Sequence, residues 1–178
     1  MKSVVIYGSN YGTTEKYAKE LAKKLNINCI NFKDVQDVNN YDTIIYLGGL
    51  YAGGVVGMKK TLNKIKEVDN KRIVIITVGL ADPKDEENIK NIRNNISNRI
   101  SSELFEKAKI FHLRGGIDYS KLGFTHKNMM RFMYNKIKKI PEENRSADVK
   151  GLIETYNKQV DFVDFNTLND ILEYIKTL

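Results

Sequence analysis

The chain begins with an apolar run, a turn rich in glycine and hydroxyl residues, and an amphipathic segment, in the order Ser3-Val4-Val5-Ile6-Tyr7-Gly8-Ser9-Asn10-Tyr11-Gly12-Thr13-Thr14-Glu15-Lys16-Tyr17-Ala18. The run 3–8 predicts a buried strand. Residues 13–25 predict a helix, because their apolar positions recur at helical spacing. A strand that enters a helix through such a turn leaves backbone N–H groups unpaired at the positive end of the helix dipole. The turn 9–14 therefore predicts either a phosphate site or a simple Ser/Thr helix cap.

The rest of the chain repeats this alternation of strand and helix. Further strands are predicted at 27–32, 43–49, 72–79 and 109–113. Three further helices are predicted from their inner apolar faces. The first has Val55, Met58, Leu62 and Ile65 on this face. The second begins at Pro83 and has Ile89, Ile92, Ile96, Ile100 and Leu104, and the third has Leu168, Ile171, Leu172 and Ile175. Strands that are apolar throughout are covered on both faces, as in a parallel sheet. Five alternations predict a doubly wound α/β fold.

Three loops are predicted to meet at one edge of this sheet. They are the segments 8–14, 49–57 and 79–86, which follow three of the predicted strands. In doubly wound sheets, ligands bind beyond the carboxyl ends of the strands. Each loop contains a glycine or another turn-forming residue, so we expect the binding site where they converge.

Length and composition indicate one soluble domain over residues 1–178. The hydrophobic content is 42% and the charged content is 29%, which is ordinary for a globular protein. The single cysteine, Cys29, excludes an internal disulfide framework and a multi-cysteine metal site, and we expect it to be a buried side chain rather than a reactive thiol. With no signal peptide and no apolar run of about 20 residues, we expect a cytoplasmic protein that does not cross a membrane.

The net charge of +7 leaves the class of partner open. Anionic lipid, an acidic protein surface or nucleic acid would each complement it, and so would no partner at all in a lysine- and asparagine-rich protein.

Two common phosphate-binding motifs are absent from the first turn. The P-loop needs four residues between its glycines and a lysine after the second, but three residues separate Gly8 from Gly12 and Thr13 follows. The dinucleotide fingerprint is also broken, because Asn10 takes the place of its second glycine. A turn without a cation suits one terminal phosphate monoester better than a metal-bound triphosphate.

The sequence Ser9-x-Tyr11-Gly12-Thr13-Thr14 resembles the FMN-phosphate loop of the flavodoxins, usually T-x-T-G-x-T, with Ser and Tyr in place of the first two Thr. The order of elements over about 1–115 is also similar to flavodoxin. The resemblance implies a flavodoxin-like five-stranded parallel sheet in the order 2-1-3-4-5, with FMN at its carboxyl edge. We expect no metal site and no nucleic-acid partner.

The same resemblance implies three groups of cofactor-binding residues. The phosphate would be held by Ser9, Asn10, Tyr11, Gly12, Thr13 and Thr14; one side of the isoalloxazine would face Leu50, Tyr51, Ala52, Gly53 and Gly54; its pyrimidine edge would meet Gly79, Leu80, Ala81 and Asp82. Tyr51 is either the aromatic that stacks on the ring or an ordinary half-buried tyrosine. The acidic residues of 82–87 either place negative charge near the ring or complement a helix N-terminus.

About fifty residues separate the fifth strand from the last helix, far more than a usual connection. Residues 121–139 hold six Lys/Arg and no acidic residue, and Met129, Met133, Ile137 and Ile140 share one helical face. We expect a basic helical insertion at about 115–150. Its apolar stripe either packs on the sheet or, at 121–140, meets anionic lipid, a partner or an anionic substrate.

The pattern GG-hydrophobic-x-Y…LG-aromatic…MMRFM at 115–133 resembles the insertion of the menaquinone-dependent protoporphyrinogen oxidases. This resemblance implies a flavin that takes electrons from a tetrapyrrole precursor and passes them to a membrane quinone. It also implies a protein that is peripheral at the membrane.

Three functions are consistent with the sequence. The first is an FMN-dependent oxidoreductase of protoporphyrinogen-oxidase type, and the second is an electron carrier that docks on redox partner proteins. The third is an interaction domain with an empty site. No catalytic side chain is predicted, because the flavin does the chemistry. His126 and Arg114 either contact a substrate carboxylate or are structural.

Overall fold

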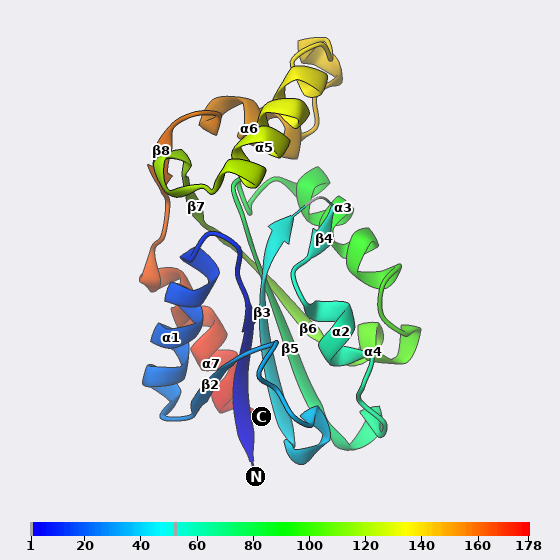
Figure 1. Ribbon diagram of the computed structural model, residues 1–178. Coiled ribbons are helices and arrows are strands. Elements are labelled where there is room, and N and C mark those ends of the chain that lie inside the picture. Colours follow the sequence, from blue (N-terminus) through cyan, green and yellow to red (C-terminus); the bar gives the residue numbers. More distant parts are fainter. Residues whose placement is uncertain (1, 52) are drawn as a thin grey trace.

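Five parallel strands form the central sheet, in the order β2-β1-β3-β5-β6, in the computed structural model, which describes residues 2–51 and 53–178 (Figure 1). The strands are β1 (Ser3–Gly8), β2 (Asn28–Asn31), β3 (Thr43–Tyr51), β5 (Arg72–Gly79) and β6 (Lys109–Arg114). Counted along the parallel strands, this order is the predicted 2-1-3-4-5, and the flavodoxin-like α/β fold is confirmed. The addition is β4 (Gly54–Val55), which pairs antiparallel with the end of β3.

Helices cover both faces of the sheet, as expected for strands that are apolar throughout. One face is covered by α1 (Thr13–Leu25) and α7 (Asn169–Lys176), which follows the 3₁₀ turn η5 (Phe165–Leu168). The other is covered by α2 (Met58–Leu62), α3 (Glu86–Ser97) and α4 (Ser102–Lys107). Short 3₁₀ turns, η1 (Val38–Asn40) and η2 (Val68–Asn70), precede β3 and β5. The two faces bury separate apolar clusters.

Two predicted helices differ from the observed ones. Val55 lies in β4 and not on a helix, and α2 is only five residues long. The predicted helix from Pro83 to Leu104 is two helices. Its first part begins at Glu86, because the Asp85 side chain accepts a hydrogen bond from the Asn88 N–H at 2.9 Å. The second begins at Ser102, where Ser101 Oγ accepts from the Leu104 N–H at 3.3 Å.

Cys29 is half-buried beside the cluster on the α1 face. Burial raises the pKa of its thiol to about 11. A thiol with so high a pKa is protonated at neutral pH and is a poor nucleophile.

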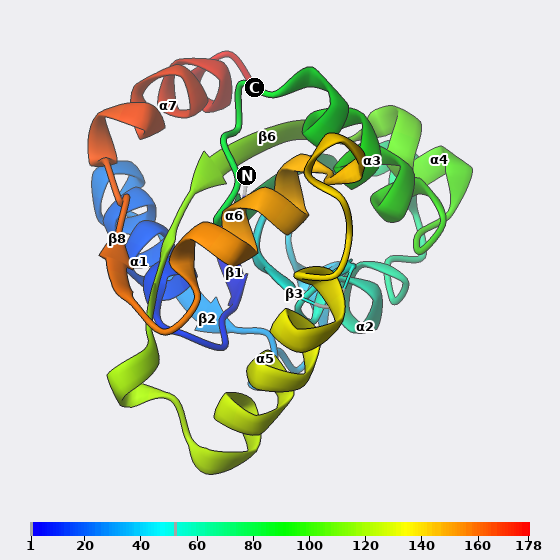
Figure 2. The ribbon, with the colours of Figure 1, turned by 90° about the horizontal axis from the view of Figure 1, so that it is seen from above.

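The segment between β6 and α7 folds over the carboxyl ends of the strands (Figures 1 and 2). Residues 116–161, called the insertion from here on, contain β7 (Gly116–Asp118), η3 (Tyr119–Lys121), α5 (Phe124–Ile137), η4 (Glu142–Asn144), α6 (Ala147–Thr155) and β8 (Gln159–Asp161). Strands β7 and β8 pair antiparallel, so the insertion returns to the point where it leaves the sheet.

The insertion has a small apolar cluster of its own. Its buried members are Ile117, Tyr119, Leu122 and Met130. The most buried residue of α5 is thus Met130, whereas Met129 and Met133 are half-buried beside the cluster. Helix α5 therefore lies across the end of the sheet and not on either face (Figure 2). None of the helices in the described ranges is long and apolar enough to cross a bilayer.

Candidate functional site

Two neighbouring cavities lie where the loops after β1, β3 and β5 converge. The inner cavity, of about 50 Å³, adjoins the turn before α1, and the outer cavity, of about 170 Å³, lies between the sheet edge, α3 and the insertion. Leu50, Tyr51, Gly79 and Leu80 line both cavities. The two spaces are therefore compartments of one site.

The turn before α1 leaves the first backbone N–H groups of the helix free of side-chain caps. Gly12 has φ +86°, a conformation that favours glycine, and Ser9 Oγ accepts a hydrogen bond from the Gly12 N–H at 3.0 Å. No side chain caps α1 itself. The hydroxyl-rich turn therefore shapes the loop, and the helix N-terminus adjoins the inner cavity, which Thr13 and Thr14 line. Helix N-termini without side-chain caps attract anions.

A third cavity, of about 280 Å³, adjoins the same turn and is lined by cationic side chains. We call it the loop cavity. Lys16 and Lys121 line it, together with His126. Lys16 Nζ lies 2.9 Å from an oxygen of Asp161, and Lys121 Nζ lies 3.4 Å from an oxygen of Asp118. The Lys16–Asp161 pair is about half-exposed on both sides and contributes little to stability. The Asp118 side chain is only 20% exposed, so the second pair is more enclosed.

Three rings from distant parts of the chain meet beside the inner cavity. The centroids of Tyr11 and Tyr51 are 6.2 Å apart, and His126 lies 5.9 Å from Tyr11 and 6.3 Å from Tyr51. The Tyr51 hydroxyl also donates to Met129 Sδ at 2.7 Å, so this tyrosine contacts the insertion. The Tyr11 hydroxyl is buried without a partner among the described residues, and burial raises its pKa. Such an unpaired hydroxyl suits a polar ligand group.

The outer cavity has walls that the sequence did not predict. Met133 of α5, Leu152 of α6 and Ile92 of α3 supply apolar surface, while Asn95 and Asp148 supply polar groups. Desolvation, with a further contribution from the Asp85 carboxylate, raises the pKa of Asp148. The Asp148 side chain is nevertheless exposed to solvent on one side. The predicted methionine stripe was the one sequence signal for an adaptable wall here.

Most of the predicted residues come together in this site. Those that line the inner or outer cavity are Asn10, Tyr11, Thr13, Thr14, Leu50, Tyr51, Gly53, Gly54, Gly79, Leu80 and Ala81. Ser9 and Gly12 shape the turn instead. Ala52 lies outside the described residues.

Asp82 and Arg114 contact their own surroundings in this structure. Asp82 lines neither cavity, because its carboxylate accepts a hydrogen bond from the Lys84 N–H at 2.8 Å within the turn before α3. Arg114 donates from Nε to the Leu80 carbonyl at 3.0 Å, and its guanidinium lies 3.9 Å from the Phe162 ring centroid. Arg114 is therefore structural.

Comparison with known proteins gives one family. The flavodoxin domain matches residues 4–144. Solved structures of similar fold include a flavoprotein in complex with FMN from Lactobacillus acidophilus NCFM (14% identity, 64% of this chain and 92% of that chain, TM-score 0.44). Another is oxidised flavodoxin 1 from Bacillus cereus (15% identity, 79% of this chain and 100% of that chain, TM-score 0.41). Oxidised flavodoxin 2 from the same organism is also similar (14% identity, 86% of this chain and 94% of that chain, TM-score 0.44). None of the curated proteins matches the chain.

Proposed function

The chain belongs to the flavodoxin domain family, and we propose that it binds FMN at the carboxyl edge of its sheet and transfers electrons through it. The observation that carries this proposal is the uncapped N-terminus of α1 at one end of two contiguous cavities whose other end is lined mainly by apolar side chains. That arrangement matches a molecule with a phosphate at one end and a flat ring at the other.

The residues present fit this cofactor. The N–H groups at the start of α1 and the hydroxyls of Thr13 and Thr14 would hold the phosphate, and Tyr11 would gain a partner for its buried hydroxyl. Leu50 and Tyr51 would form one wall of the ring site. When bound, the flavin supplies the electron-transfer chemistry, and the protein positions it and excludes water.

Entry of FMN requires the insertion to move. Each cavity is smaller than the roughly 300–1,000 Å³ of a typical small-molecule pocket. Met133 and Leu152 narrow the outer cavity from above, and the Tyr51–Met129 contact joins the sheet edge to α5. We therefore propose that α5 and α6 shift outward on binding and then cover the ring.

A titration with FMN tests the cofactor proposal. We expect a yellow protein that binds one FMN and quenches its fluorescence. Thr13→Val removes one hydroxyl from the turn without changing the shape of the side chain, and FMN should bind about tenfold more weakly, as expected for the loss of one hydrogen bond to a charged group. Thr125→Val, at an exposed position in the first turn of α5, is the matched control and should bind normally. A colourless protein that takes up no FMN contradicts the proposal.

We further propose that the protein is an oxidoreductase that passes electrons from an organic substrate to a quinone, as the resemblance at 115–133 implies. The exposed side of α5 supports a location at a membrane surface. Phe124 is 83% exposed and Phe132 is 72% exposed, and the cations Lys127 and Arg131 lie on the same helix. Exposed aromatics among cations suit an anionic bilayer, where quinones dissolve. The alternative is a carrier whose partner is another redox protein.

An anaerobic assay separates the two functions. The FMN-loaded protein is given protoporphyrinogen and a menaquinone, and oxidation of the porphyrinogen is followed by absorbance. Turnover supports the oxidase. Loaded protein without turnover, which still exchanges electrons with a redox protein, would establish the carrier instead.

A further inference from the structure

The insertion contains a cavity that the flavin site does not use. It measures about 450 Å³ and lies between η3, α5 and the segment 156–159. It shares no lining residue with the inner or outer cavity, and only Asp118 and Gln159 with the loop cavity. We call it the insertion cavity. Any ligand it binds would be a second one, beside the flavin.

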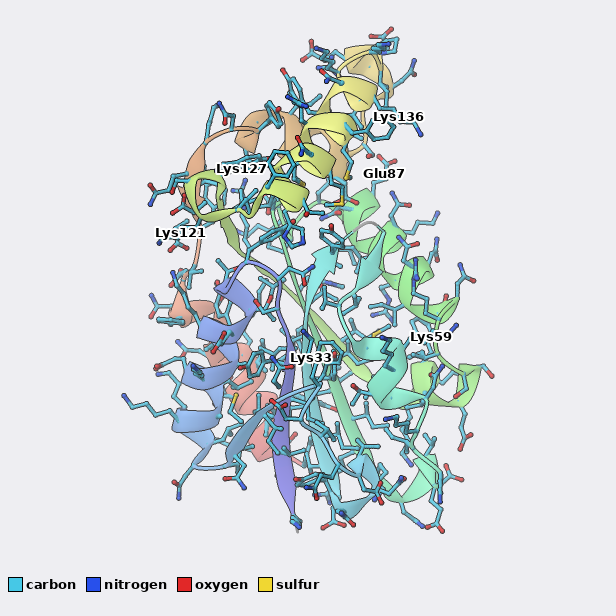
Figure 3. All side chains as sticks on the ribbon, viewed as in Figure 1. Lys33, Lys59, Glu87, Lys121, Lys127 and Lys136 are labelled. Carbon is cyan, nitrogen blue, oxygen red and sulfur yellow. The ribbon has the colours of Figure 1, made fainter. Side chains whose placement is uncertain are left out.

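The charge of the insertion cavity is positive. Lys127 and Arg131, one helical turn apart on α5, line it together with Lys158. In the part of the chain that the structure describes, none of these three cations pairs with a carboxylate. Lys127 and Lys121 both lie on the insertion, above the sheet (Figure 3).

The one carboxylate that lines the cavity is already engaged. Asp118 Oδ1 accepts hydrogen bonds from the Ser120 N–H at 2.9 Å and from its hydroxyl at 2.6 Å. Asp118 Oδ2 lies 3.4 Å from Lys121 Nζ. These partners hold the pKa of the carboxyl below its usual range. Asp118 is therefore held in its own turn, and the charge of Lys121 offsets that of its carboxylate, which leaves the three cations in excess.

Tyr119, which lines the same cavity, has a buried hydroxyl without an acceptor in the described part of the chain. Tyr119 is only 7% exposed, and its hydroxyl has no hydrogen-bond partner among the described residues. The backbone N–H of Asn157 is near it, but that group can only donate. Burial raises the pKa of Tyr119 to about 12, so the phenol keeps its proton at neutral pH. It is a buried donor that no acceptor in the described chain satisfies.

The aromatic wall of the cavity is held in place. The ring of Tyr156 stacks on Tyr134, with centroids 3.9 Å apart and an interplanar angle of 5°. Tyr119 meets Tyr156 edge-on at 5.5 Å and 76°. The stack therefore fixes the position of the Tyr156 ring, which lines the cavity.

We propose that the insertion cavity binds a phosphate monoester group. Three cations with one engaged carboxylate match a dianion, and the planar guanidinium of Arg131 can donate two parallel hydrogen bonds to phosphate oxygens. The volume exceeds what a lone phosphate fills, so the group belongs to a larger molecule, either a soluble phosphate ester or a lipid with a phosphate head group. This proposal does not depend on flavin binding.

Calorimetric titration with glycerol 3-phosphate at constant ionic strength tests the soluble source. We expect Arg131→Gln and Lys158→Gln each to weaken binding at least tenfold. Lys136→Gln removes a charge from an exposed site farther along α5, outside the cavity, and should bind normally. The titrations are repeated with excess FMN, whose phosphate would occupy the turn 9–14 and so remove any contribution from that turn.

Pelleting with vesicles tests the lipid source. Phosphatidate in a phosphatidylcholine membrane offers the same monoester, and phosphatidylcholine alone is the blank. Loss of phosphatidate binding in Arg131→Gln but not in Lys136→Gln supports a head-group ligand, and binding of glycerol 3-phosphate alone supports a soluble one. The proposal is overturned if neither probe binds, if Lys136→Gln weakens binding as much as Arg131→Gln, or if succinate binds as tightly as the phosphate ester.

Discussion

At the scale of single residues, Gly57 occupies a position where both the backbone and the surroundings require glycine. Its φ is +76°, and a Cβ there would lie 2.5 Å from Phe32 Cγ and 2.6 Å from the Tyr46 hydroxyl oxygen. Gly53 has a similar φ of +71°, but open space surrounds its missing Cβ. Comparing alanine substitutions at Gly57 and Gly53 therefore separates the cost of backbone strain from the cost of steric overlap.

We predict that Gly57→Ala lowers the free energy of unfolding by about 3 kcal/mol, the sum of left-handed strain and overpacking. Gly53→Ala should cost about 1 kcal/mol, because only the strain remains. Urea denaturation of the two variants measures the difference. Equal losses would show that the space around Phe32 adapts.

His112 makes stability depend on pH. Its Nδ1 lies 2.7 Å from Thr77 Oγ1, its Nε2 is buried without a partner in the described chain, and Asn88 Oδ1 is likewise unpaired in the same small cavity. Desolvation, and to a lesser degree the charge of Arg93, lowers the pKa of His112 to about 4. The folded protein thus holds this imidazole neutral.

Because the unfolded chain takes up the proton near pH 6.5, the stability from neutral His112 is present above that pH and is lost as the pH falls toward 4. We predict a loss of about 2 kcal/mol over this range from this group, after allowance for its partial exposure. Thermal unfolding of the wild type and of His112→Leu at pH 7 and pH 4.5 isolates the contribution of His112 to this pH dependence. Parallel pH profiles for the two proteins would refute the prediction.

At the scale of elements, the Tyr134–Tyr156 stack connects α5 to the end of α6. We predict that Tyr134→Ala increases amide hydrogen exchange along α5 and speeds FMN release about tenfold, because α5 then opens more easily. Phe132→Ala removes an exposed ring of the same helix and should change neither rate. If the two variants behave alike, the stack does not hold α5 in place.

Elements were predictable from sequence where the signal was local. The helix 13–25 has an apolar face and a glycine turn before it, and both agree with the structure. The break between α3 and α4 was missed because Ile96, Ile100 and Leu104 keep helical spacing across it, so the apolar pattern continues although the Ser101 cap starts a new helix. Apolar spacing alone therefore does not show where one helix ends and the next one on the same face begins.

The residues of the site were likewise predictable only where the sequence signal was local. Residues of the turn 9–14 and of the loops after β3 and β5 were predictable, because the carboxyl ends of parallel strands meet at one edge. Met133, Asp148 and Leu152 were not, since nothing in the sequence of α5 or α6 states which surface they pack against. The assignment of Asp82 to the ring site stays a prediction, although its carboxylate is engaged within its own turn.

At the scale of the whole molecule, the protein has separate apolar clusters on the two faces of the sheet and in the insertion. The insertion cluster is the smallest, and we predict that residues 116–161 unfold locally before the sheet does. Native-state hydrogen exchange in low urea should give lower opening free energies for α5 and α6 than for β3 and β5. Equal values throughout would indicate one cooperative unit.

The pairing of β7 with β8 makes the insertion replaceable. Asp118 lies opposite Gln159, so a two-residue Asn-Gly turn could join these strands in place of residues 119–158. The shortened chain would keep β1 to β6 and α7 and would show whether that scaffold is autonomous. Such a closed hairpin also means that residues 119–158 could differ in length or sequence between related proteins while the two ends that join the sheet stay where they are.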